Sequence, residues 1–284
     1  MTIPAPSSSP PSSDNPADRL SLLLRVGVFV LIGWLGTELF PMLMAPFGDL
    51  IVTSALSTFA AAAVANAITV RIYEHGRLSD IGLGTNGRSL REFFTGAGVA
   101  AGAATVMLVV PVTLSIASFE RVPVNGNPWV NLAFIGVVLL FGAAGEEMLF
   151  HGYAFQLLVR SIGAFAAILP VGVLFGLVHL SNQNATILAA VNTAGWGILL
   201  GYAYVRTGAL WLPIGMHFGW NLSLSLFGVN LSGFTMGVTG YGLLWRTGDL
   251  WSGGAYGPEG GLLTTFVVVG LFFVLPRITP EEVA

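Results

Sequence analysis

Long stretches of apolar residues run through most of this chain. Several contain about 18 or more residues without a charge, enough to cross a hydrocarbon core of roughly 30 Å. Backbone polar groups must be paired inside lipid, and these stretches are continuous rather than alternating, so helices are favoured over a barrel. The sequence therefore predicts an all-α, polytopic transmembrane bundle of about eight helices. The expected spans are residues 20–43, 50–70, 92–118, 129–158, 163–181, 185–205, 208–227 and 261–276.

The composition excludes several classes of protein. Charged residues make up only 9% of the chain, whereas a soluble domain carries about 25%, so a water-facing surface cannot be covered. The net charge is −3 and there is no basic run, so membrane lipid is an expected partner and nucleic acid is not. The chain has no cysteine, which excludes disulfides, thiolate nucleophiles and cysteine-ligated metals.

The amino-terminal segment differs from the rest of the chain. Residues 1–18 are rich in proline and serine and almost free of large apolar side chains, which predicts a disordered tail. The apolar run that follows is too long for the core of a signal peptide, and no small-x-small cleavage site comes after it. We therefore expect residues 19–284 to form one transmembrane bundle.

The arginines indicate how the bundle is oriented. If the amino terminus is cytoplasmic, nine of them fall on the cytoplasmic side, and only Arg121 and Arg246 fall on the other. This is the bias that the positive-inside rule describes. We expect a multi-pass protein of a bacterial plasma membrane with both termini in the cytoplasm. The nine are Arg19, Arg25, Arg71, Arg77, Arg88, Arg91, Arg160, Arg206 and Arg277.

Two adjacent acids, Glu146 and Glu147, lie inside the fourth predicted span. One ionisable residue at membrane depth costs about 2.5–3.5 kcal/mol on insertion scales. Two like acids side by side multiply that cost, so stability alone would not select them. The pair therefore indicates a functional site.

Helical spacing adds further polar groups to this pair. Positions four residues apart share a helix face. Glu147 and His151 have this spacing, and so do His217 and Asn221. Phe175 precedes His179 by the same interval, which predicts that the phenyl ring packs against the imidazole. Unpaired polar groups in lipid are driven to meet one another, so we expect the polar side chains of these three helices to lie close together.

Such a set of side chains suits hydrolysis by an activated water. A carboxylate can act as general base while a histidine shares the proton, and a second histidine and an amide can donate to the oxyanion. Two histidines and a glutamate could instead hold zinc and leave one position open for water. The spacing leaves both mechanisms open.

Three motifs in this order resemble the CPBP family, which includes the CAAX prenyl endopeptidases and bacteriocin-related membrane proteases. They are GEEMLFHG, FGLVHL and TGALWLPIGMHFGWN, and GPEGG before the last span is also typical of the family. The resemblance covers about residues 125–265, with a catalytic core at about residues 129–225. It implies a helical membrane protease.

The resemblance implies a role for each polar residue of the three motifs. Glu146 corresponds to the water-activating acid, assisted by His179, and His217 and Asn221 correspond to the pair that stabilises the oxyanion. The family is often described as metalloproteases. If zinc is present, Glu146, His179 and His217 are the implied ligands, although the glutamate mechanism needs no metal.

The second acid is the place where this sequence departs from the family. Glu147 normally has an arginine four residues later, and this chain has His151 there. Arginine is always charged, whereas an unperturbed histidine titrates near pH 6.5. We predict a weaker, pH-sensitive pairing between Glu147 and His151, so His151→Arg should change the pH–activity profile.

The leading hypothesis is an intramembrane endopeptidase that acts on a peptide or a lipidated protein. A non-proteolytic immunity or scaffold protein of the same family is the alternative, favoured only by His151. A proton-coupled transporter ranks last because no inverted repeat stands out. Neither GxSxG nor HExxH occurs, so the serine and zinc proteases with those motifs are not indicated.

Overall fold

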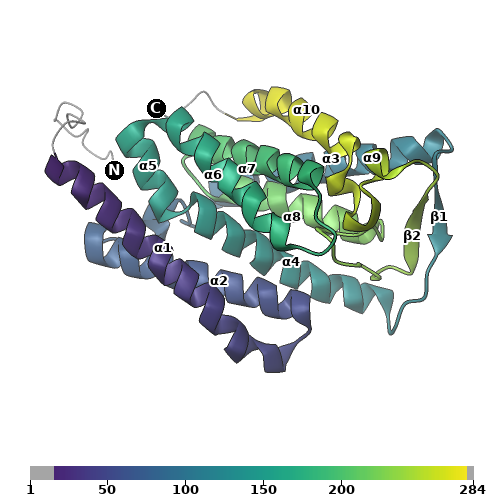
Figure 1. Cartoon of the computed structure of the whole chain (residues 1–284), viewed down its shortest axis with the longest axis horizontal. Coiled ribbons are helices and arrows are strands. Elements are labelled where there is room, and N and C mark those ends of the chain that lie inside the picture. Colours follow the sequence, from purple (N-terminus) through teal and green to yellow (C-terminus); the bar gives the residue numbers. More distant parts are fainter. Residues whose placement is uncertain (1–15, 280–284) are drawn as a thin grey trace.

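The computed structural model describes residues 16–279, which form a helical bundle elongated along the direction of its longest helices (Figure 1). This confirms the predicted all-α architecture. The helices are α1 (Pro16–Met44), α2 (Leu50–Thr69), α3 (Gly87–Thr113), α4 (Pro128–His151), α5 (Tyr153–Ile162), α6 (Ala164–Val178), α7 (Ile187–Thr207), α8 (Trp211–Leu226), α9 (Asp249–Ser252) and α10 (Leu262–Ile278). Two short strands, β1 (Ala117–Arg121) and β2 (Tyr241–Trp245), lie at one end.

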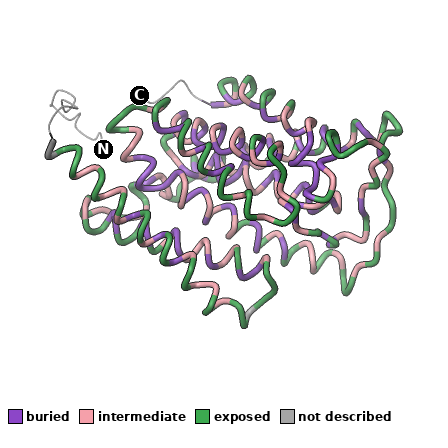
Figure 2. The backbone as a smooth tube through the Cα atoms, in the orientation of Figure 1, coloured by how far each residue is buried: buried purple, intermediate pink, exposed green. Residues whose placement is uncertain are grey.

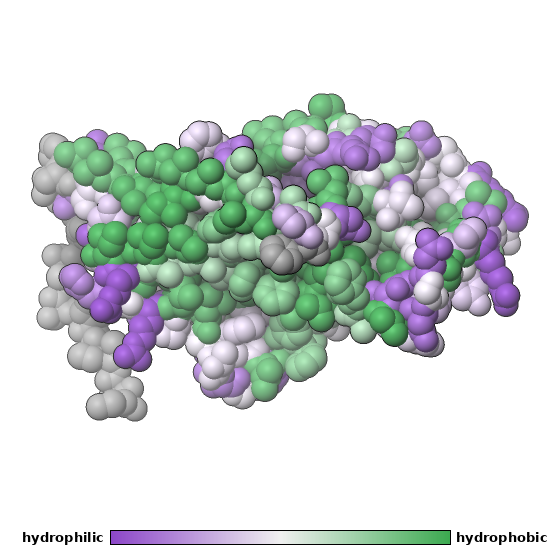
Figure 3. Space-filling view, turned by 90° about the horizontal axis from the view of Figure 1, so that it is seen from below, coloured by the Kyte–Doolittle hydropathy of each residue, from purple (hydrophilic) through white to green (hydrophobic). Residues whose placement is uncertain are grey.

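The outer surface of the bundle is apolar. Within the described residues, six helical stretches are long and apolar enough to cross a membrane, and the two other predicted spans, α8 and α10, have 16 and 17 residues. Large side chains such as Phe165 and Trp129 face outward, 82% and 78% exposed. Figure 2 shows that many residues of the outer helices are exposed. Figure 3 shows that hydrophilic residues gather toward the two ends of the bundle. The protein is therefore an integral membrane protein.

Local sequence signals start the helices where the structure has them. Asp49 accepts a hydrogen bond from the Val52 amide at the start of α2, and Asn86 and Thr186 cap α3 and α7 in the same way. Short polar side chains at these positions satisfy amides that have no partner inside the helix. Pro128 begins α4, where its missing N–H costs nothing.

Glycines let the helices that carry the polar motifs pack closely in pairs. A Cβ atom at Gly215 or Gly219 of α8 would collide with the backbone of α3. Gly172 and Gly176 of α6 meet α7 in the same way. Small residues at such spacing allow close approach of helices in membranes, where packing rather than hydrophobicity drives association. This packing fixes the depth of His217, which lies between the two glycines of α8.

Two predicted spans differ from the structure. The helix expected over 129–158 breaks at Gly152, whose ψ of −144° is not helical, so α4 and α5 are separate helices. Asn66 of α2 holds the break, because it accepts from the Tyr153 amide at 2.8 Å and donates to the Met148 carbonyl at 2.9 Å. A remote amide thus satisfies the backbone groups that the break exposes.

The span expected over 92–118 ends earlier, at Thr113. Residues 117–121 form β1, which pairs antiparallel with β2, so Ala117 faces Trp245. Ser115, with a φ of 60°, turns the chain out of the helix. The segment 228–260, between the last two predicted spans, contains this second strand, and it also carries α9 and two short 3₁₀ turns.

The predicted disordered tail lies mostly outside the described residues. Residues 1–15 are not described, and the first helix begins at Pro16 rather than after residue 18.

Candidate active site

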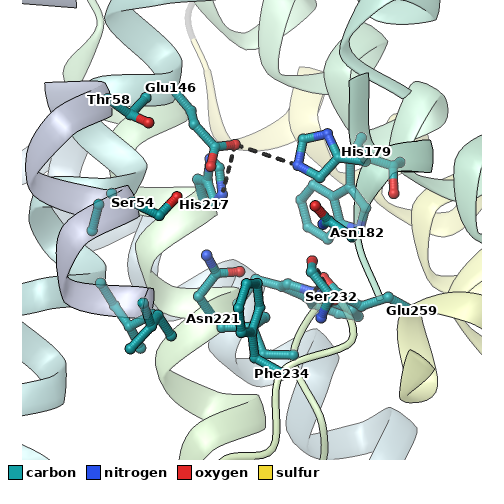
Figure 4. A pocket seen from close by; sticks show the side chains of 18 of the residues that line it. Ser54, Thr58, Glu146, His179, Asn182, His217, Asn221, Ser232, Phe234 and Glu259 are labelled. Atoms are coloured by element: carbon teal, nitrogen blue, oxygen red, sulfur yellow. Dashed lines mark hydrogen bonds and ion pairs between the residues drawn. The ribbon is translucent and has the colours of Figure 1, made fainter. Parts of the chain in front are cut away.

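A cavity of about 170 Å³ lies between α2, α4, α6, α7 and α8 (Figure 4). The cavity is lined by five of the residues that the sequence motifs identified, but not by Glu147 or His151. The five are Glu146, Phe175, His179, His217 and Asn221.

Glu146 faces the histidines of two other helices across this cavity. Its Oε2 atom lies 3.6 Å from Nε2 of His179 and 3.9 Å from Nε2 of His217. These distances are longer than hydrogen bonds, and Oε2 has no hydrogen-bond partner within the described chain. The side chain is 30% exposed, and that area borders the cavity. Oε2 itself is buried, so this carboxylate has one oxygen that no group of the described chain satisfies.

The position of Glu146 follows from close packing of α4 on α2. A Cβ atom on Gly145 would lie 2.6 Å from the Phe59 amide nitrogen, so only glycine allows this approach. The approach places Thr58 and Ser54 of α2 on the wall of the cavity beside Glu146 (Figure 4).

His179 is the first residue after α6, and the end of that helix orients its ring. Its Nδ1 lies 2.6 Å from the Phe175 carbonyl oxygen, so Nδ1–H donates and a neutral ring presents the Nε2 lone pair to Glu146. The Phe175 ring packs against the imidazole with centroids 4.8 Å apart. The predicted spacing thus brings these two rings together.

Glu147 sits in a separate, sealed cluster next to the cavity. Its side chain is 0% exposed, with Oε2 2.7 Å from Nδ1 of His151 and Oε1 2.8 Å from Nδ1 of His217. His151 is also buried, and a Cβ atom at Gly201 would lie 3.2 Å from its Nε2. The imidazole therefore occupies the space that Gly201 leaves open, and an arginine would need additional room there.

His217 connects the sealed cluster to the cavity. Its Nδ1 contacts Glu147, while its Nε2 points toward Glu146. Asn221 follows one turn later on α8, and its amide projects into the same cavity (Figure 4). The structure therefore brings together the acids, the histidines and Asn221 of the three sequence motifs, with Glu147 and His151 behind the cavity wall.

Residues 128–223 match the family model described as type II CAAX prenyl endopeptidase Rce1-like. This segment begins with α4 and reaches into the last turn of α8, so it contains both glutamates, the three histidines and Asn221, but not Ser54 and Thr58 of α2. The match covers about a third of the chain and supports its resemblance to the CPBP/CAAX proteases. It points to a membrane protease in general. No curated protein matches the chain.

The cavity is also lined by a carboxylate that lies outside the matched residues 128–223. Glu259 accepts hydrogen bonds from Nε1 of Trp220 at 3.0 Å and from the Ser232 amide at 2.6 Å, and its own carbonyl accepts from Asn192. Burial and the nearby Glu259 charge raise the pKa of Tyr256, in the adjacent loop, to about 12. Sequence reasoning noted the GPEGG motif but assigned Glu259 no role, because nothing local shows that this loop reaches α8.

A metal centre fits these side chains poorly as they are arranged. Among the described residues, no group of three histidine, cysteine, aspartate or glutamate side chains has the arrangement that would hold a metal ion. The donor types of Glu146, His179 and His217 suit zinc, but each histidine nitrogen lies 3.6 Å or more from the Glu146 oxygen that it faces. We therefore derive no chemical step through a metal.

Proposed function

We propose that this CAAX-protease relative is an intramembrane endopeptidase that hydrolyses peptide bonds with a water activated by Glu146 and His179. The observation that carries the proposal is the contrast within the acid pair. Oε2 of Glu146 has no hydrogen-bond partner and faces two imidazole nitrogens across a cavity, while both oxygens of Glu147 are occupied.

Water activation requires a base and a second group that shares the proton. A water held in the cavity between the Glu146 carboxylate and Nε2 of His179, which lie 3.6 Å apart, can form normal hydrogen bonds to both. The Phe175 carbonyl keeps the proton of a neutral His179 ring on Nδ1. Glu146 then takes a proton from the water while the water oxygen attacks the carbonyl carbon of the peptide bond.

The oxyanion that forms needs donors that are already in place. The side-chain amide of Asn221 can donate to it, and so can Nε2–H of His217 when both ring nitrogens carry protons. Glu147, 2.8 Å from Nδ1, balances the positive charge of that doubly protonated ring. Glu147 acts here as a positioning residue, because it reaches the substrate only through His217.

Collapse of the tetrahedral intermediate breaks the C–N bond. The proton taken by Glu146 and His179 passes to the leaving amine, so the products are an acid and an amine and no co-reactant other than water is consumed.

The charged side chains lining the cavity are two glutamates and two histidines, with no arginine among the described lining residues. An arginine partner for a terminal carboxylate is therefore missing, which favours cleavage at internal bonds.

The test uses purified protein in liposomes with a pool of plain and prenylated peptides, read by mass spectrometry. Glu146→Gln should lower the turnover number by about 10²–10⁴-fold, the usual contribution of a general base. Glu120→Gln, on exposed β1, makes the same change of charge far from the cavity and should leave turnover unchanged. The peptides that are cut would show whether a prenyl group is required.

Two outcomes would overturn the proposal. Equal cleavage by wild type and Glu146→Gln would exclude Glu146 as the base. An absence of cleavage in a broad pool, with correctly folded wild type, would favour the binding role of an immunity or scaffold protein.

A further inference from the structure

The cavity extends from Glu146 toward one end of the bundle only. On α4, its lining residues all precede Glu146, beginning at Val138, and on α2 they come from the first three turns, residues 51–58. On α8, which runs the opposite way, they follow His217. All three sets therefore lie on the side of Glu146 that faces the β1–β2 end (Figure 1).

Loops at that end complete the wall of the cavity. Asn182 comes from the turn between α6 and α7, and Ser232 and Phe234 come from the segment after α8. These side chains surround the lower part of the cavity in Figure 4, and all three are partly exposed. Ser54 on α2 is exposed while also lining the cavity. The opening therefore lies among these loops and the first turns of α2.

The opposite end of the site is closed. Glu147 and His151 are completely buried, and Tyr153 and Phe155 beyond them are 1% and 2% exposed. Gln156 fills the remaining space, donating to the Ile81 carbonyl at 3.0 Å and to the His151 carbonyl at 3.1 Å. Water and substrate cannot pass through this packing without unfolding it.

The closed end carries most of the basic residues. Contacts join several of them there: Arg25 binds Glu74 at 3.1 Å, Arg88 donates to the Thr207 carbonyl, and Arg206 holds the end of α10. The two arginines of the other group, Arg121 and Arg246, lie on or next to the strand pair. Arginine-rich ends of membrane bundles face the cytoplasm.

We infer that the active-site cavity opens to the non-cytoplasmic side of the membrane, so the substrate is an extracytoplasmic peptide segment or the outer end of a membrane protein. The direction of opening follows from the cavity and the arginines, while the identity of the substrate as a peptide rests on the proposed function. A peptide that stays on the cytoplasmic face would meet the closed end, about two helical turns of buried side chains from Glu146.

The absence of cysteine from the chain makes a direct test possible. Single cysteines would be introduced as Ser54→Cys at the cavity, Asn125→Cys near the strand pair and Ser79→Cys in the loop between α2 and α3. Intact cells would be treated with a membrane-impermeant maleimide, before and after permeabilisation, and the cysteine-free parent would give the background. Labelling does not depend on activity, so this test can fail or succeed independently of the proposed hydrolysis.

Ser54→Cys and Asn125→Cys should label in intact cells, and Ser79→Cys should label at least tenfold more after permeabilisation. The inference is overturned if Ser54→Cys labels only after permeabilisation, together with Ser79→Cys. It is equally overturned if Ser54→Cys stays unlabelled in detergent-solubilised protein while both other cysteines react, because the cavity would then be closed.

Discussion

Glu146 and Glu147 are neighbours in the sequence, yet they belong to two regions with opposite properties. The region around Glu146 is a cavity, and Oε2 of this residue has no hydrogen-bond partner in the described chain. The region around Glu147 is solid, with two imidazoles at 2.7 and 2.8 Å and no exposed surface. Successive residues on a helix point about 100° apart, which is enough to place one side chain in each region.

This difference separates a reacting group from a supporting one. An acid without a fixed partner can exchange a proton with water, whereas an acid held by two rings fixes their orientation. His217 transmits the order of the solid region to the cavity, because each of its nitrogens faces one of the two acids. The two regions therefore make different predictions for activity and for stability.

The largest contrast is expected between Glu146→Gln and Glu147→Gln. Removing one partner from a buried charge pair typically costs about 3–5 kcal/mol, so Glu147→Gln should unfold at a clearly lower temperature. Glu146→Gln should keep the wild-type melting temperature and lose only turnover. Thermal unfolding in detergent measures both. Equal melting temperatures for the two variants would contradict the division into a cavity and a solid region.

Asn221→Ala should lower the turnover number by about 10²–10³-fold, the usual loss when one oxyanion donor is removed. The Michaelis constant should change little, because the donor acts mainly in the transition state. Asn182→Ala is the matched control, since it removes an amide from the same cavity at a position that takes no part in the proposed chemistry. Similar losses in both variants would mean that the amides shape the cavity rather than bind the oxyanion.

His151→Leu tests how far the sealed cluster around Glu147 depends on the imidazole. Nδ1 of His151 lies 2.7 Å from Oε2 of Glu147, and both side chains are buried. Leucine fills a similar volume but offers no hydrogen bond, so it leaves a buried carboxylate oxygen without this partner at a cost of about 1–3 kcal/mol. The variant should therefore unfold at a lower temperature than wild type, which thermal unfolding in detergent measures. An unchanged melting temperature would show that His151 contributes by packing alone.

A strong chelator is expected to have the smallest effect. The derived steps use only side chains of the chain itself, so dialysis against a chelator should leave turnover within about twofold of its starting value. Wild-type protein assayed before and after dialysis, with zinc restored in a third sample, measures this. Loss of turnover that zinc reverses would mean that Glu146, His179 and His217 move closer around a metal than they lie here.

Much of the architecture could be predicted because its causes are local. The cost of exposing backbone and charge to lipid determines the apolar spans, and short capping residues such as Asn86 determine where helices begin. The sequence could not locate the break at Gly152, because Asn66, from another helix, satisfies the backbone groups at that point. It also extended the third span too far, since the pairing of β1 with β2 depends on residues more than a hundred positions later.

The sequence by itself determined that this is a membrane protein with acids, histidines and an amide on helix faces, because helical spacing and the price of burying charge can be read residue by residue. Its motifs also indicated the CAAX-protease family, which the match over residues 128–223 supports. Only the tertiary structure decided which acid faces the cavity, how Glu259 joins it and toward which end it opens. These features depend on rotation and depth of helices relative to one another, set by contacts such as Gly145 on Phe59 between distant segments.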